Sequence, residues 1–206
     1  MSKKTDFAAL QTLFVEASMI RAAQPENAKC RTIGADINAF QNESFKRQLE
    51  AIVKHGFVTV EGLQSLAAAI AICDDKHADY VGLKVITKIR QCIYALSNKM
   101  RSKLDHYTDT ILSSLSLNSE LTNKSGLVCL SREVVYTETD MVQRLDHTKV
   151  KVSASTASTQ LSSSRMMLHH MNICNVVKHK RNDSFSFKDS PQAHAIIEYY
   201  KRDEAV

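Results

Sequence analysis

The stretch Ser153–Lys188, SASTASTQLSSSRMMLHHMNICNVVKHKRNDSFSFK, decides the fold expected for the second half of this chain. Small and aliphatic side chains recur at helical spacing along one face of its first part: Ala157, Leu161, Ser164, Leu168 and Met171. The opposite face carries hydroxyl groups and one arginine: Ser155, Thr156, Ser158, Thr159, Ser162 and Arg165. A serine at position 153 or 155 is a good helix cap. The pattern predicts a helix with one buried and one polar face.

The second part of this stretch predicts a β-hairpin. Ile173–Lys178 is rich in β-branched residues, and Ser184–Lys188 alternates polar and aromatic residues with a period of two. Between them, Lys180–Asp183 contains Asn and Asp, which favour tight turns. We therefore expect a hairpin with a basic tip.

The residues before this helix complete a recognisable order of elements. Glu133–Tyr136 predicts a short strand, Asp140–Asp146 a short helix, and His147–Val152 a basic turn. This order resembles that of winged helix-turn-helix domains, over about residues 107–188, with Tyr107–Leu117 as the first helix. The resemblance implies that the helix from Ser153 enters the major groove of DNA and that the hairpin contacts its backbone or minor groove. Asn172 stands where such domains often have glycine.

The distribution of charge agrees with this resemblance. The chain has 206 residues and a net charge of +5. Between Arg144 and Lys188 there are eight basic and two acidic residues, whereas the rest of the chain has 19 basic and 20 acidic residues. Lysine and arginine in this segment would neutralise phosphates and release counterions.

We therefore predict that one set of residues contacts DNA: Lys149, Lys151, Ser153, Ser155, Thr156, Ser158, Thr159, Ser162, Arg165, Lys178, Lys180 and Arg181. The alternative is that the hydroxyl face is simply solvated and that the basic hairpin binds an acidic protein partner. RNA binding is a weaker alternative, because the segment offers few aromatic side chains for base stacking.

The first half of the chain predicts a bundle of helices. We place a helical domain at residues 1–118 and the winged-helix-like domain at residues 119–206, with a loop at Ser119–Ser125 between them. A long helix is expected over Lys76–Asp105. Its apolar side chains alternate in steps of three and four: Ile86, Ile89, Ile93, Leu96 and Met100. They belong either to the core of the bundle or to the interface of a homodimer.

Composition excludes several classes of protein. The chain has only five glycines and two prolines, too few for a β-sandwich, and it contains no nucleotide-binding glycine motif. Its five cysteines are scattered without a C-x-x-C pair, which favours a reducing, cytoplasmic location and no metal site. The longest apolar run, Leu66–Cys73, is too short to cross a membrane. We expect no cofactor, and no catalytic motif indicates an enzyme.

The sequence thus predicts a mainly α protein, with an N-terminal helical domain containing a long helix and a C-terminal α+β winged helix. We expect it to bind duplex DNA sequence-specifically, as a transcription regulator or as a replication or partition factor. The N-terminal region would form a homodimer. The alternative is a helical scaffolding or adaptor protein.

Overall fold

The computed structural model describes residues 5–28, 30, 32–72, 81–131, 133–134, 152–178 and 183–204. Contacts along the chain divide it into two compact units, Met1–Lys103 and Leu104–Val206. The boundary predicted from the sequence, near Asn118, lies one helix further along the chain. Each unit is described by itself.

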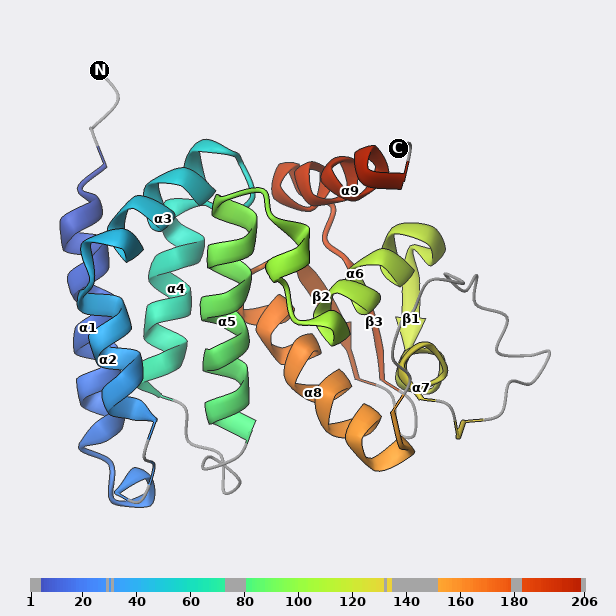
Figure 1. The fold of residues 1–206 in the computed structure, drawn as a ribbon, viewed down its shortest axis with the longest axis horizontal. Helices are drawn as coiled ribbons and strands as arrows, with labels where there is room; N and C mark the ends of the chain where they lie inside the picture. The colour runs from blue at the N-terminus through green and yellow to red at the C-terminus, as the bar shows by residue number, and fades with distance from the viewer. Residues whose placement is uncertain are drawn as a thin grey trace. The chain divides into compact units, whose positions relative to one another are not determined.

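The first unit is entirely helical in its described part. Its elements are α1 (Phe7–Ala22), the 3-10 turn η1 (Pro25–Asn27), α2 (Ile33–Gln41), α3 (Glu43–Lys54), α4 (Val60–Ala71), α5 (Val81–Ser97) and the 3-10 turn η2 (Arg101–Lys103). Helix α1 packs against α2, α3 and α4, and α3 packs against α5 (Figure 1). This arrangement confirms the helical bundle expected from the sequence.

Three phenylalanines hold the middle of this bundle together. Phe14 from α1, Phe40 from α2 and Phe45 from α3 lie with ring centroids 4.8–5.4 Å apart, in tilted or edge-to-face arrangements. Such geometry suits the charge distribution of aromatic rings. Each ring is buried, so one side chain from each of three helices fixes their packing.

The starts of α3 and α4 follow local capping rules. The hydroxyl of Thr59 accepts a hydrogen bond from the N–H of Gly62 at 3.0 Å, as expected for the cap of α4. Asn42 caps α3 by accepting from the N–H of Ser44 at 2.9 Å. Helix α3 ends just before Gly56, whose φ of +74° suits a residue without a side chain.

Helix α5 is shorter than the helix predicted over Lys76–Asp105. It ends at Ser97, because Lys99 has a φ of +52° and turns the chain away from the helix axis. Residues 76–80 lie outside the described part of the chain. The apolar residues Ile86, Ile89, Ile93 and Leu96 are all at most 2% exposed. These four are therefore core residues of this chain, which is the first of the two interpretations of the seam. The fifth predicted member, Met100, lies beyond the end of α5 and is 40% exposed, so it does not belong to the core.

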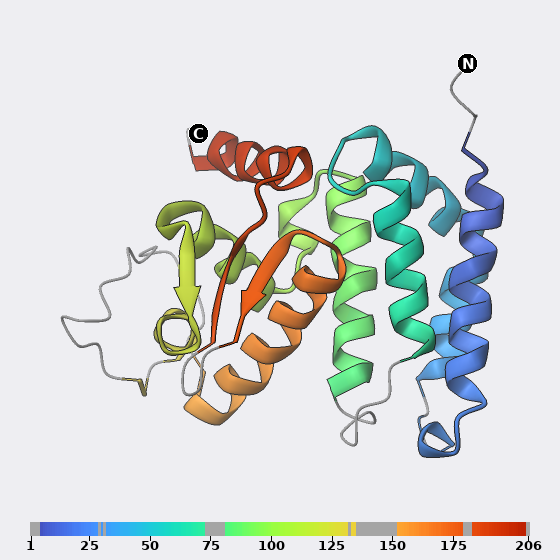
Figure 2. The same cartoon turned by 180° about the vertical axis from the view of Figure 1, so that it is seen from behind.

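The second unit combines helices with a small sheet. Its elements are α6 (His106–Asn118), β1 (Glu120–Thr122), α7 (Asn123–Leu130), α8 (Ala154–His170), β2 (Cys174–Val177), β3 (Ser184–Phe187) and α9 (Pro191–Glu204). Helix α6 packs against α7, α8 and α9, and α8 packs along β2 (Figure 2). The predicted helix near Ser153 and the predicted hairpin are therefore confirmed as secondary structure.

The three strands form one antiparallel sheet in the order β1-β3-β2. Leu121 of β1 and Val176 of β2 both lie opposite Phe185 of the central strand. Leu121 and Phe185 are each 1% exposed, so this row of side chains forms the buried side of the sheet. The short strand β1 is held by pairing with residues more than sixty positions later in the sequence.

The loop predicted at Ser119–Ser125 is wrong, since β1 and the start of α7 occupy it. Thr122 caps α7 in a capping box, in which the Thr122 hydroxyl accepts from the N–H of Ser125 and the Ser125 hydroxyl accepts from the N–H of Thr122. The strand predicted at Glu133–Tyr136 does not begin at Glu133 or Val134, which lie in a bend. The predicted short helix Asp140–Asp146 lies outside the described residues.

The described chain is thus mainly helical, with a small three-stranded antiparallel sheet. No helix within it has the length and apolar character needed to cross a membrane.

Candidate nucleic-acid interface

Helix α8 begins at the cap predicted from the sequence. The Ser153 hydroxyl accepts a hydrogen bond from the N–H of Thr156 at 3.5 Å and donates one to the Thr156 hydroxyl at 3.1 Å. It also lies 3.3 Å from the hydroxyl of Ser155. These contacts fix the first turn of the helix, because they satisfy groups that the helix itself leaves unpaired. Ser153 and Thr156 therefore act mainly within the protein.

The buried face of α8 is the one that the sequence predicts. Ala157, Leu161 and Leu168 are at most 3% exposed. Ser164 is also buried, and its hydroxyl lies 3.0 Å from that of Thr108 on α6, which satisfies both groups. A serine in this row of aliphatic residues is thus explained by its partner on the facing helix.

The polar face of α8 is only partly open to solvent. Ser155 and Ser158 are exposed, whereas Thr159 and Ser162 are half-buried. The hydroxyl of Thr159 donates to the backbone carbonyl of Ser155 at 3.1 Å, a bond that ties it to its own helix. Of the predicted hydroxyl contacts, Ser155 and Ser158 are the most accessible.

Arg165 has a role within the protein that the sequence did not reveal. Its Nη1 donates to Asn123 Oδ1 at 2.6 Å and to Asp183 Oδ2 at 3.2 Å. The N–H of Asn123 in turn donates to the carbonyl of Asp183 at 2.8 Å. One guanidinium therefore joins the start of α7, the middle of α8 and the residue before β3. This ion pair reduces the charge that Arg165 could offer to a phosphate.

A carboxylate lies at the N-terminus of α8. Glu133 Oε2 accepts a hydrogen bond from the N–H of Ala154 at 2.8 Å, and the N–H of Glu133 donates to Ser131 Oγ at 3.1 Å. A negative charge at this position complements the helix dipole. Any phosphate that approached the N–H of Ala154 would compete with Glu133. The side chains that stay exposed are Ser155, in this same first turn, and Ser158, in the next turn.

The two ends of the connection between α7 and α8 are bonded to each other. Ser131 and Val152 form a parallel bridge, and the N–H of Val152 donates to the carbonyl of Leu130 at 3.1 Å. The end of α7 and the start of α8 therefore lie side by side although many residues separate them in sequence. Lys149 and Lys151, both predicted to contact DNA, lie between these ends and outside the described residues.

The hairpin returns toward the N-terminal half of α8. Strand β2 packs on α8, and its last residue, Val177, pairs with Ser184, the neighbour of the Asp183 that bonds Arg165 in the middle of α8. Lys178 is exposed. The tip, with the predicted contacts Lys180 and Arg181, lies outside the described residues.

Two further groups in this region carry less charge or reactivity than their type suggests. Burial lowers the pKa of His170 below its ordinary value, and the nearby His169 adds to this effect, so His170 is neutral at pH 7. Burial raises the pKa of the Cys174 thiol to about 12, so it stays protonated. Within the described residues, no three His, Cys, Asp or Glu side chains gather to hold a metal ion.

Comparisons of this chain with family models, with curated proteins and with solved structures find no match.

Proposed function

We propose that the C-terminal unit is a winged helix-turn-helix module that binds duplex DNA. The observation that carries the proposal is the order α6-β1-α7-α8-β2-β3, in which a first strand pairs with the hairpin that follows the longer helix. The sequence suggests a similar order but from other residues, since the strand was predicted at Glu133–Tyr136 and the short helix at Asp140–Asp146, whereas β1 and α7 precede both. In this proposal α7 and α8 are the two helices of the motif, and β2 and β3 form the wing.

The accessible residues of α8 and the hairpin supply the proposed contacts. Ser155 and Ser158 are on the open face of α8, and their hydroxyls can bond either phosphate oxygens or base edges. Lys178 leads into the basic tip of the hairpin and would contact the backbone. Helix α8 has 17 residues, enough to lie along the major groove, whose width admits one helix.

The cellular role follows as part of the same proposal. A module that reads duplex DNA suits a transcription regulator or a factor in replication or partition. The helical N-terminal unit would provide contacts with a second copy of the chain or with another protein. On α1, Leu13, Met19 and Ile20 are 39–56% exposed and offer an apolar surface for such a contact.

The salt dependence of DNA binding tests this proposal. If about six phosphates are contacted, the logarithm of the binding constant should fall with the logarithm of salt concentration with a slope of about −5. Lys178→Gln should reduce the steepness of this slope by about one and weaken binding to all duplexes alike. Fluorescence anisotropy with a pool of random duplexes measures both effects on the full chain.

A matched variant and a second substitution sharpen the test. Lys201 is an exposed lysine on α9, the helix that follows β3, and it is not one of the proposed DNA contacts. Lys201→Gln should therefore leave DNA binding unchanged. Ser158→Ala should change the set of sequences selected from random DNA, if this face reads bases. The proposal is rejected if no duplex binds at low salt, and a large oligomer that forms without DNA would favour the scaffolding alternative.

A further inference from the structure

The N-terminal unit contains an open groove that its own packing does not fill. The groove lies between the end of α2, the start of α3 and the outer side of α5, and its volume is about 510 Å³. This volume is within the range typical of sites for small organic molecules. It is formed entirely by residues of the first unit, so it is a property of that unit alone.

The side chains that line the groove suit a small anion with an apolar body. Tyr94, which is 40% exposed, provides aromatic surface, Phe45 also lines the groove but is only 4% exposed, and Arg90 and Lys103 provide positive charge. The side-chain amides of Gln48 and Gln91 also face it, and within the described residues neither amide has a hydrogen-bond partner. No aspartate or glutamate from the described residues lines the groove. The balance of charge therefore favours a negative ligand.

The start of α3 adds to this preference. Asn42 and Ser44, the cap of α3 and a residue of its first turn, both line the groove. The N-terminus of a helix carries a partial positive charge and backbone N–H groups without partners inside the helix. At α3 the N–H of Ser44 is already bonded to Asn42 Oδ1 and Glu43 brings a carboxylate to the first turn, so the contribution of the helix end is small beside that of Arg90 and Lys103.

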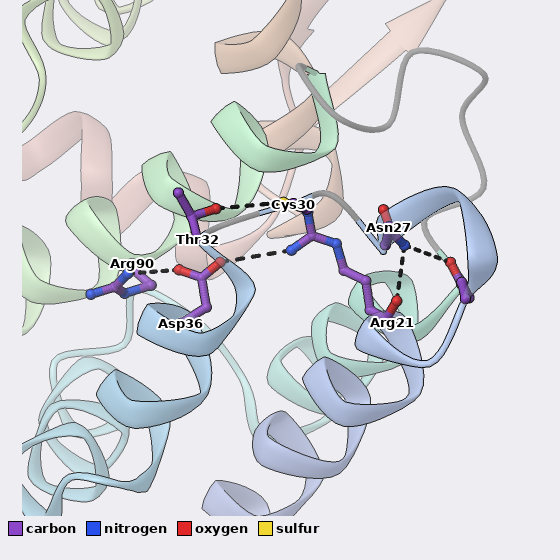
Figure 3. A network of polar contacts seen from close by, with 7 residues as sticks. Arg21, Asn27, Cys30, Thr32, Asp36 and Arg90 are labelled. Carbon is purple, nitrogen blue, oxygen red and sulfur yellow. Dashed lines mark hydrogen bonds and ion pairs between the residues drawn. The ribbon is translucent and has the colours of Figure 1, made fainter.

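The buried carboxylate of Asp36 holds Arg90 in place. Its Nη1 donates to Asp36 Oδ1 at 2.7 Å, while the Arg90 side chain is 34% exposed (Figure 3). A single ion pair of this kind fixes the guanidinium and leaves other N–H donors for a ligand. Arg90 is therefore positioned before any ligand arrives, which lowers the entropic cost of binding.

The same carboxylate serves a second arginine. Arg21 Nη1 lies 3.7 Å from Asp36 Oδ2, and the Arg21 side chain is 1% exposed (Figure 3). Within the described residues, no guanidinium nitrogen of Arg21 has a hydrogen-bond partner. Burial raises the pKa of Asp36 above its ordinary value, against the opposing effect of the two arginines. Two guanidiniums thus share the single carboxylate of Asp36, which cannot neutralise both. Of the two arginines, Arg90 lines the groove and Arg21 does not.

We propose that this groove binds a small organic oxyanion, a carboxylate or a phosphate ester, whose charged group pairs with Arg90 and Lys103. Its apolar or aromatic part lies against Tyr94, and the amides of Gln48 and Gln91 bond its remaining polar atoms. The site is independent of the DNA-binding proposal, because all of its residues lie in the first unit.

Calorimetric titration of the full chain with three related probes tests the site. Benzoate and phenyl phosphate carry an oxyanion on an aromatic ring, and benzamide is the neutral counterpart of benzoate. We expect one or both anions to bind in the millimolar range and benzamide to bind about tenfold more weakly than the better anion. The stronger of the two anions identifies the headgroup as carboxylate or phosphate.

Substitutions then place the binding in the groove. Lys103→Gln should weaken the better anion about threefold, because Lys103 is exposed and its charge is partly screened. Tyr94→Ala should also weaken it. Lys54→Gln removes an exposed lysine of the same unit that does not line the groove, so it should have no effect. The proposal is overturned if neither anion binds better than benzamide, or if Lys103→Gln and Lys54→Gln weaken binding equally.

Discussion

Lys99, Gly56 and Asn172 end three different helices in the same way. Each follows a helix with a positive φ, of +52°, +74° and +61° respectively. In each case the next residue donates its N–H back to a carbonyl five residues earlier: Met100 to Ala95, Phe57 to Ile52, and Ile173 to Leu168. Glycine adopts this conformation at no steric cost, asparagine at some cost and lysine at more. In this chain, which has few glycines, a lysine and an asparagine therefore occupy two of these three left-handed positions.

Lys99→Gly should increase the stability of the first unit. Relief of the left-handed backbone strain should raise the free energy of unfolding by about 1 kcal/mol. Lys99→Ala removes the same charge but keeps the strain, so it is the matched control and should give no such gain. Urea denaturation of the two variants measures the difference, and equal stability would contradict this account of Lys99.

Sequence reasoning succeeded at single residues where the contact is local. The predicted cap Ser153 bonds the N–H of Thr156, three residues later and within the same turn. Arg165 was predicted as a DNA contact, but its partners Asp183 and Asn123 are 18 and 42 residues away in the sequence. Such distant partners leave no local pattern, so the part of Arg165 in holding the unit together could not be predicted.

At the scale of elements, helices were easier to predict than the first strand. Glu120–Thr122 has only three residues, too few to show an alternating pattern, and it exists because β3 pairs with it. Helix α7 was missed for a related reason, since polar residues at its start resemble a loop until the capping box is seen. The predicted hairpin was longer, with a clear alternation in Ser184–Phe187, and it was confirmed.

Close packing of α7 on α8 depends on Gly126. A methyl group at this position would lie 2.8 Å from Leu161 Cδ1 and 3.0 Å from Cδ2. Although alanine favours the helix over glycine, Gly126→Ala should lower the free energy of unfolding by about 1 kcal/mol through overpacking. Thermal denaturation of the full chain measures the change.

Two further variants isolate the cause. In a Leu161→Val background the shorter side chain leaves room, so Gly126→Ala should then cost much less or become stabilising. Gly34→Ala on α2 meets no atom within 4 Å and should be stabilising by about 0.5 kcal/mol. A loss from Gly126→Ala that is the same in both backgrounds would show that Leu161 is not the obstacle.

At the scale of the whole molecule, the second unit has a core of its own. Buried residues come from α6, α7, α8, the sheet and α9, among them Leu112, Val128, Leu168, Phe185 and Tyr200. The hydroxyl of Tyr200 also donates to Asp109 Oδ1 on α6 at 2.9 Å, which joins the last helix of the chain to the first helix of this unit. A unit built in this way should fold without the rest of the chain.

A fragment of residues 104–206 should therefore unfold cooperatively on heating and retain the DNA affinity of the full chain within a few fold, if it acts as a monomer. Circular dichroism and fluorescence anisotropy measure the two properties. A fragment that lacks a cooperative transition would show that the division at Lys103 does not mark an independent domain. A folded fragment with much weaker binding would assign part of the affinity to the first unit, through dimerisation.

The candidate interface was only partly accessible to prediction. The exposed side chains of Ser155 and Ser158 on α8 follow from helical periodicity. Lys149, Lys151, Lys180 and Arg181 lie outside the described residues, so their part in the interface stays a prediction. The carboxylate of Glu133 at the start of α8 does not follow from periodicity, because its bond to Ala154 spans 21 residues. The groove in the first unit could not be predicted from the sequence either, because it depends on the distances between three packed helices.

The bridge between Ser131 and Val152 has a consequence for engineering and for divergence of the sequence. Where the two ends of a connection are already held together, its length can change without moving the elements that it joins. A fluorescent reporter or an epitope inserted into this connection would leave α7 and α8 in register. For the same reason, sequence changes that spare Ser131, Glu133 and Val152 would leave the start of α8 in place.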